Sequence, residues 1–195
     1  YAYEILMRSF AADDMLRVPG LIRLAEFYDK INGFLASRVF YRKALQIMIA
    51  NEKGEEIQAI PLHYGIAHSY LMERFPPFYV SNAADSRSIG LIPGLDDADL
   101  FQQHLSVNNF PEGERALQSA VAIATTKDPE NSELIEEATM KLADWHLMWD
   151  RQREAITLYT SVYQSIELRG VDPNETFEMP FLIYLPEPKQ PRSPL

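Results

Sequence analysis

The chain of 195 residues contains no cysteine. This absence excludes disulfide bonds, thiolate zinc sites and a cysteine nucleophile, and it is compatible with an oxidising compartment as well as with the cytosol. The sequence also lacks an apolar run close to the roughly 20 residues that a membrane-spanning helix needs, and it shows no signal-peptide pattern. We therefore expect no direct insertion into a membrane, and the cellular compartment stays open.

Positive charge is scarce. The 18 lysine and arginine residues are outnumbered by 28 aspartate and glutamate residues, which gives a formal net charge of −10. A nucleic-acid groove and an anionic membrane surface both select a clustered basic face, so we expect neither as a partner. The densest basic group, Arg38, Arg42 and Lys43, lies on one expected helix. We interpret this group as a solvent-exposed helix face.

Recognisable catalytic and metal-binding patterns are also lacking. His63 and His68 are five residues apart, which puts them on different sides of a helix, whereas helical metal ligands are four apart. The acidic residues Asp96, Asp97 and Asp99 lack the glycine and final glutamate of a calcium loop, so helix capping explains them better. No nucleophile elbow, phosphate-binding loop or dinucleotide fingerprint occurs. We predict a protein that is not an enzyme, with no catalytic residue, cofactor or metal site.

One pattern that is present is a spacing of residue types that occurs twice. A small residue is followed twelve positions later by another small residue, then by a tyrosine and an apolar residue. The two occurrences are Ala25, Ser37, Tyr41, Ala44 and Ala143, Ala155, Tyr159, Val162. Two antiparallel helices that cross closely need small side chains where their backbones approach and an aromatic ring to fill the gap below. The spacing therefore predicts two antiparallel helix pairs.

Helical patterning extends over most of the chain. After a helix in residues 1–14, we expect helices at about 19–30, 34–49, 55–73, 112–127, 133–149 and 154–168. Asn32-Gly33 ends the first of these because glycine tolerates a left-handed backbone, and Asn131-Ser132 can cap the helix at 133–149. Pro61 indicates either a later helix start or a kink. We expect a helical domain over 1–170 with an insertion at 75–111 containing a helix at 95–107, and an extended Pro-rich tail or linker over 171–195.

Three segments resemble tetratricopeptide repeats. In that family a bulky apolar, a small and an aromatic residue in one helix are followed by a small residue, an aromatic and an alanine in the next. The first segment matches all six positions, the middle one matches in its first helix, and the last departs at His146 and Val162. The matching residues are Leu24, Ala25, Tyr28, Ser37, Tyr41 and Ala44, then Ile66, Ala67 and Tyr70, then Leu142, Ala143, Ala155 and Tyr159. The resemblance implies an all-α fold, a right-handed α-α superhelix of about three degenerate units.

The resemblance also implies a binding scaffold, in which the first helices of the stacked pairs line a concave groove that holds a peptide or a partner protein. By register, the groove residues are Ile22, Glu26, Asp29, Lys30, Tyr64, His68, Leu71, Met72, Met140, Asp144, Leu147 and Met148. This wall is largely apolar and acidic. The subgroup that grips a C-terminal carboxylate has lysine, arginine and asparagine where this chain has Ile22, Tyr64 and Met140, so we do not expect that ligand.

Two alternatives stay open. The end of the chain also resembles bacterial envelope repeat proteins that precede a TonB-type domain, which implies a structural segment, in the periplasm rather than the cytoplasm, with its own tail in the groove. Deletion from Met179 onward should then lower the melting temperature.

The second alternative concerns Trp145, Trp149 and their neighbouring methionines. In one interpretation these side chains pack as repeat core, and in the other they form an adaptable docking surface.

Overall fold

The computed structural model describes residues 2–74 and 110–171, and these residues form seven α-helices, two short 3₁₀ helices and no strand. The predicted all-α class is confirmed for this part of the chain. The α-helices are α1 (Ala2–Ser9), α2 (Val18–Lys30), α3 (Phe34–Ala50), α4 (Ile60–Arg74), α7 (Phe110–Lys127), α8 (Ser132–Met148) and α9 (Gln152–Leu168), and the 3₁₀ helices are η1 (Met15–Arg17) and η2 (Ile57–Ala59).

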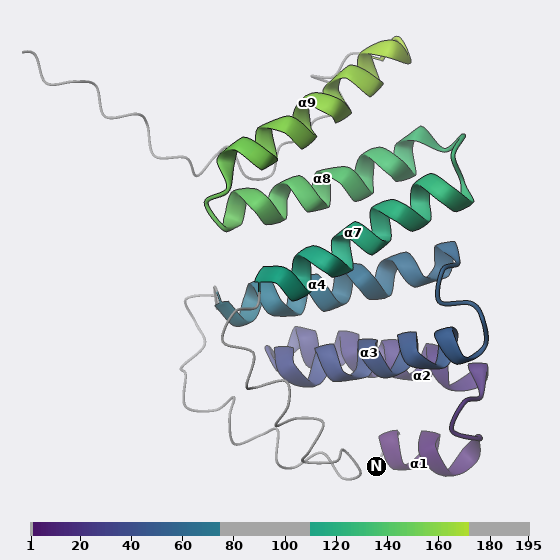
Figure 1. Ribbon diagram of the computed structural model, residues 1–195. Helices are drawn as coiled ribbons and strands as arrows, with labels where there is room; N and C mark the ends of the chain where they lie inside the picture. Colours follow the sequence, from purple (N-terminus) through teal and green to yellow (C-terminus); the bar gives the residue numbers. More distant parts are fainter. Residues whose placement is uncertain (1, 75–109, 172–195) are drawn as a thin grey trace, which may run out of the picture.

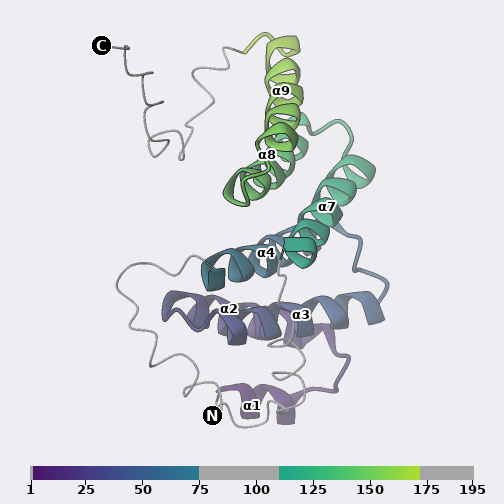
Figure 2. The same ribbon diagram turned by 60° about the vertical axis from the view of Figure 1, so that its left-hand side comes forward.

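The helices stack in chain order, from α1 at one end of the molecule to α9 at the other (Figures 1 and 2). Neighbours in this order pack against each other: α2 on α3, α3 on α4, α4 on α7, α7 on α8 and α8 on α9. The short α1 is attached by side chains, since the Leu6 side chain lies over Gly20 of α2 and the Tyr3 ring meets the Phe40 ring edge-on at 5.3 Å.

The small residues of the repeated spacing are buried on the paired helices. Ala25 on α2 and Ser37 and Ala44 on α3 have no exposed surface, and Ala143 on α8 and Ala155 on α9 are at most 1% exposed. Small side chains at these points let the backbones of α2 and α3, and of α8 and α9, approach closely. The two predicted helix pairs are confirmed.

Helix boundaries follow local signals in the sequence. Pro61 lies in the first turn of α4, where a missing N–H costs nothing, so the proline marks the helix start and not a kink. Asn131 caps α8, as predicted, because its side chain accepts a hydrogen bond from the Leu134 N–H at 3.2 Å. At the turn between α2 and α3 the prediction was wrong in detail: Asn32 and not Gly33 adopts the left-handed conformation, with φ 61°.

The insertion predicted at 75–111 ends earlier than expected, because α7 begins at Phe110 with Pro111 in its first turn. Residues 75–109 and 172–195 lie outside the described residues. The predictions of a helix at 95–107, of capping by the acidic residues 96–99 and of an extended tail over 171–195 therefore stay predictions.

Buried apolar side chains form two clusters that meet at α4. The first holds the cores of α2 and α3 with the start of α4, the second half of α7 and Ala138 of α8. The second holds the end of α4 with Phe110, Leu117 and Trp145. Four half-buried residues pack against both clusters, namely Tyr41, Leu45, Tyr64 and Val121. Trp145 is 2% exposed and is therefore a core residue, whereas Trp149, Met140 and Met148 are half-buried.

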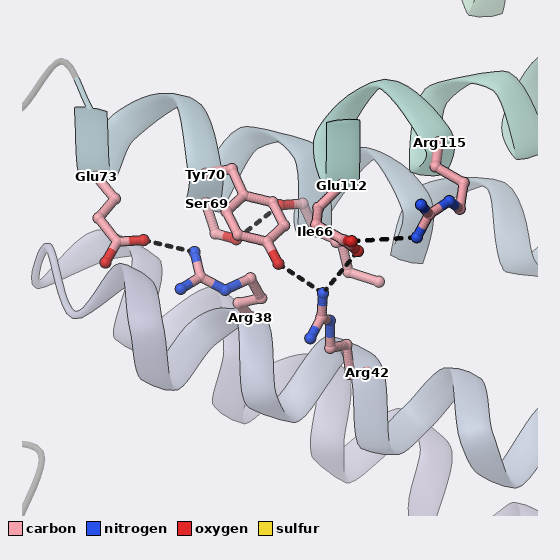
Figure 3. Close-up of polar contacts among 8 residues, drawn as sticks. All are labelled: Arg38, Arg42, Ile66, Ser69, Tyr70, Glu73, Glu112 and Arg115. Atoms are coloured by element: carbon pink, nitrogen blue, oxygen red, sulfur yellow. Dashed lines mark hydrogen bonds and ion pairs between the residues drawn. The ribbon is translucent and has the colours of Figure 1, made fainter. Parts of the chain in front are cut away.

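The interpretation of Arg38 as part of a solvent-exposed basic face was wrong. Its side chain has no exposed surface, donates to Glu73 Oε2 at 2.7 Å and lies 4.0 Å from the centre of the Tyr70 ring. Figure 3 shows how the interactions continue: the Arg42 guanidinium donates to the Tyr70 hydroxyl and lies 3.6 Å from Glu112, which also pairs with Arg115. These polar contacts connect α3, α4 and α7.

Candidate functional site

The residues predicted to line a groove lie on α2, α4 and α8, and each of them is half-buried or exposed. None of them is fully buried, so each keeps some surface that a ligand could contact. They are Ile22, Glu26, Asp29 and Lys30 on α2, Tyr64, His68, Leu71 and Met72 on α4, and Met140, Asp144, Leu147 and Met148 on α8. We call this set the α2–α4–α8 face.

The α2 and α4 parts of the face are joined by an acid–histidine contact. The Nδ1 atom of His68 lies 3.3 Å from Asp29 Oδ2, and the His68 side chain is 49% exposed. Tyr41 reaches the same place from α3, where its ring covers Gly65 of α4. Burial, together with the nearby Asp29 and Glu26 carboxylates, raises the pKa of Tyr41 to about 12, so this hydroxyl keeps its proton at neutral pH.

The α4 and α8 parts are joined through Tyr64. The ammonium group of Lys141 lies 5.1 Å from the centre of the Tyr64 ring, a cation–π distance, and 3.8 Å from Glu137. Burial, and to a smaller extent the Glu137 carboxylate, raises the pKa of the Tyr64 hydroxyl. Tyr64 thus presents a neutral hydroxyl and an aromatic ring between the two helices.

The third part of the face is fixed by the partner helix α9. The Tyr159 hydroxyl donates a hydrogen bond to Asp144 Oδ1. Burial raises the pKa of Asp144, and the Tyr159 bond and the Lys141 charge partly offset that rise. The bond holds the Asp144 carboxylate on the α2–α4–α8 face in one orientation.

Two polar atoms of this face are buried and have no hydrogen-bond partner within the described part of the chain. They are Asp29 Oδ1 and Tyr64 Oη. Buried polar atoms in folded proteins are nearly always paired, and leaving one unpaired costs about 1–3 kcal/mol. Because both atoms are almost completely covered, a ligand bound on this face would meet other atoms of these two residues and leave both unpaired.

The contacts bring Asp29 next to His68. They also bring Tyr64 next to the segment of α8 that carries Met140 and Asp144. Ile22 packs instead against the first buried cluster, and Leu71 against the second. Sequence reasoning missed the contribution of Glu137 and Lys141, and it assigned Tyr41 and Tyr159 only a space-filling role. The recurring tyrosine was the available signal, because a tyrosine that fills a gap at a surface also places its hydroxyl there.

Within residues 2–74 and 110–171, no group of three or more histidine, aspartate or glutamate side chains is arranged to hold a metal ion. In the same ranges, no helix combines the length and the hydropathy that crossing a bilayer would need.

Comparison of the sequence with protein-family models and with curated proteins finds no match. The resemblance to tetratricopeptide repeats therefore stays a prediction from the residues quoted above.

Proposed function

We propose that the chain is a protein-interaction scaffold of tetratricopeptide-like repeats, stacked as a right-handed superhelix, that binds an extended peptide or a segment of a partner protein on the α2–α4–α8 face. The observation that carries this proposal is that contacts join half-buried and exposed side chains of three helices into one face, through Asp29 with His68 and Tyr64 with Lys141. A peptide supplies backbone N–H and C=O groups along its whole length, which suits scattered single acceptors and donors better than a compact ligand does.

The chemistry of the face favours particular peptides. Its carboxylates are Glu26, Asp29 and Asp144, whereas its half-buried apolar side chains include Met140 and Met148. Methionine adapts its shape to different partners. We therefore expect bound sequences to combine lysine or arginine with apolar residues.

A selection from a random-peptide display library with the full chain as bait tests the proposal. Selected peptides are then titrated against wild type, His68→Ala and Met148→Glu, with Gln118→Glu on the exposed side of α7 as a control for charge. We expect the first two variants to weaken binding at least about ten-fold, a change of about 1.4 kcal/mol, and the control to bind as wild type. Tyr64→Glu is less suitable, because Tyr64 packs against both buried clusters and its loss would disturb the fold.

The proposal fails if no peptide is selected. It also fails if peptides bind all three variants as tightly as the wild type, because the binding surface would then lie elsewhere on the molecule.

A further inference from the structure

A cavity of about 610 Å³ lies apart from the residues of the α2–α4–α8 face. It is bordered by the second half of α3, the turn at 52–55, the start of α4 and the second half of α7. Its volume is within the range of about 300–1,000 Å³ typical of small-molecule sites. His63, which precedes Tyr64 in the chain, lines this cavity.

The walls of the cavity are largely aliphatic. Leu45 and Ile49 of α3 line one side, and Ala122 and Ile123 of α7 line the other. Ile49 is 59% exposed although it is a large apolar residue. Such walls suit an apolar or aromatic body, which would cover the Ile49 side chain on binding.

The polar groups of the cavity are mostly acceptors. The hydroxyls of Ser119 and Thr126 donate hydrogen bonds within α7, to the carbonyls of Arg115 at 3.0 Å and Ala122 at 2.7 Å. Each hydroxyl can therefore only accept a hydrogen bond from a molecule in the cavity. The carboxylates of Glu52 and Glu55 are at the exposed rim. The one cation of the lining, Lys127, lies 3.9 Å from Glu56.

His63 is a further polar residue of the cavity lining, and it differs from the others because it is buried. Its side chain is only 9% exposed, and among the described residues it makes no hydrogen bond or ion pair. Burial lowers the pKa of this imidazole, so it is neutral at pH 7 and offers one acceptor and one donor. A buried imidazole without a protein partner beside a cavity is suited to a hydrogen bond with a bound molecule.

We propose that this cavity binds a small primary amine with an aromatic body, its ammonium group at the Glu52 and Glu55 carboxylates and its ring between the walls of α3 and α7. The surplus of acceptors selects a ligand rich in donors, and the two rim carboxylates select a positive charge. An anion of the same shape would face these carboxylates with a like charge. This binding site is independent of the peptide-binding face.

A matched pair of probes tests the proposal on the full chain by calorimetric titration. Tryptamine carries an ammonium group and a ring N–H, whereas indole-3-propionate has a similar shape and a carboxylate. We expect tryptamine to bind at least about ten-fold more tightly than indole-3-propionate. The double variant Glu52→Gln/Glu55→Gln should weaken the binding of tryptamine about three- to ten-fold, since exposed ion pairs contribute only modestly to binding.

The control is Glu130→Gln/Glu167→Gln, which removes the same net charge at exposed positions outside the cavity lining and should leave the affinity for tryptamine unchanged. His63→Phe, which removes both imidazole nitrogens at nearly the same side-chain size, should weaken the binding of tryptamine, and its melting curve shows whether the variant is folded. The proposal is overturned if tryptamine does not bind, if both probes bind equally, or if the two double variants have the same effect.

Discussion

At the scale of single residues, the most unusual feature is a guanidinium group inside the helix stack. Arg38 has no exposed surface, and it is stabilised by the Glu73 carboxylate at 2.7 Å and by the face of the Tyr70 ring. Taking a charge out of water is costly, and hydrogen bonding to an opposite charge offsets that cost. The pair links α3 to the last turn of α4.

We therefore expect Glu73→Gln to lower the free energy of unfolding by about 1–2 kcal/mol, less than for a fully buried pair because Glu73 is 30% exposed. Urea denaturation measures this change. The matched control is Glu4→Gln, whose partner Arg8 is at the surface, and it should cost less than about 0.5 kcal/mol. Equal effects of the two variants would show that the Arg38 guanidinium does not depend on this carboxylate.

A second residue-scale prediction concerns pH. Because burial lowers the pKa of His63 in the folded state, the unfolded chain binds a proton more readily, near its ordinary value of about 6.5. The stabilisation by neutral His63 is complete above that value and is lost as the pH falls below it. His63→Gln should therefore show a smaller loss of unfolding free energy than wild type between pH 7 and pH 5. If His63→Gln and the wild type lost the same unfolding free energy over this range, His63 would not be a buried, neutral imidazole.

Residue roles were predictable from the sequence where they depend on neighbours in the chain. Ala25, Ser37 and Ala155 could be assigned to helix contacts because their spacing repeats. The burial of Arg38 could not, because its partner Glu73 is 35 residues away and is brought to it only by the packing of α3 on α4.

At the scale of elements, α7 and α8 are held together by an aromatic contact on glycine. The Trp145 ring of α8 covers Gly113 of α7, and it also contacts the rings of Phe110 at 6.0 Å and Trp149 at 5.5 Å. A methyl group at position 113 would overlap the rigid indole, which these neighbours prevent from moving freely.

We expect Gly113→Ala to destabilise the protein by about 1–3 kcal/mol, although alanine is the better helix former by about 1 kcal/mol. The control is Gly20→Ala, where the new methyl group would meet the flexible end of Leu6 at 2.8 Å. Thermal or urea denaturation of both variants checks the order of the two effects. A stabilised Gly113→Ala variant would show that α7 and α8 are less closely packed than described.

The helices themselves were largely predictable, because capping and proline signals such as Asn131 and Pro61 act within one turn. The assignment of residues on α2, α4 and α8 to one binding face came only from the resemblance to a repeat family, and it stays a prediction. The contacts of this face, such as Asp29 with His68, depend on how α2 and α4 pack, and no local pattern encodes that packing.

At the scale of the whole molecule, the two buried clusters are not independent. Tyr41, Leu45, Tyr64 and Val121 pack against both, so loss of one cluster uncovers side chains of the other. We expect the described helices to unfold as one cooperative unit.

Of the two tryptophans of the chain, Trp145 belongs to the second cluster and Trp149 packs against it. Their fluorescence reports on that cluster, whereas far-ultraviolet circular dichroism reports on all helices. The two signals should give the same urea midpoint. A fluorescence midpoint that differs from the dichroism midpoint would instead indicate two separately folding halves.

NMR chemical shifts locate the peptide-binding surface residue by residue and so test whether it is the α2–α4–α8 face. A peptide selected on the full chain is added to the isotope-labelled protein, and the backbone amide shifts are followed. We expect the largest shifts at Asp29, Tyr64 and His68 and along α8 around Asp144. Shifts confined to other surfaces, such as the outer side of α9, would contradict this expectation.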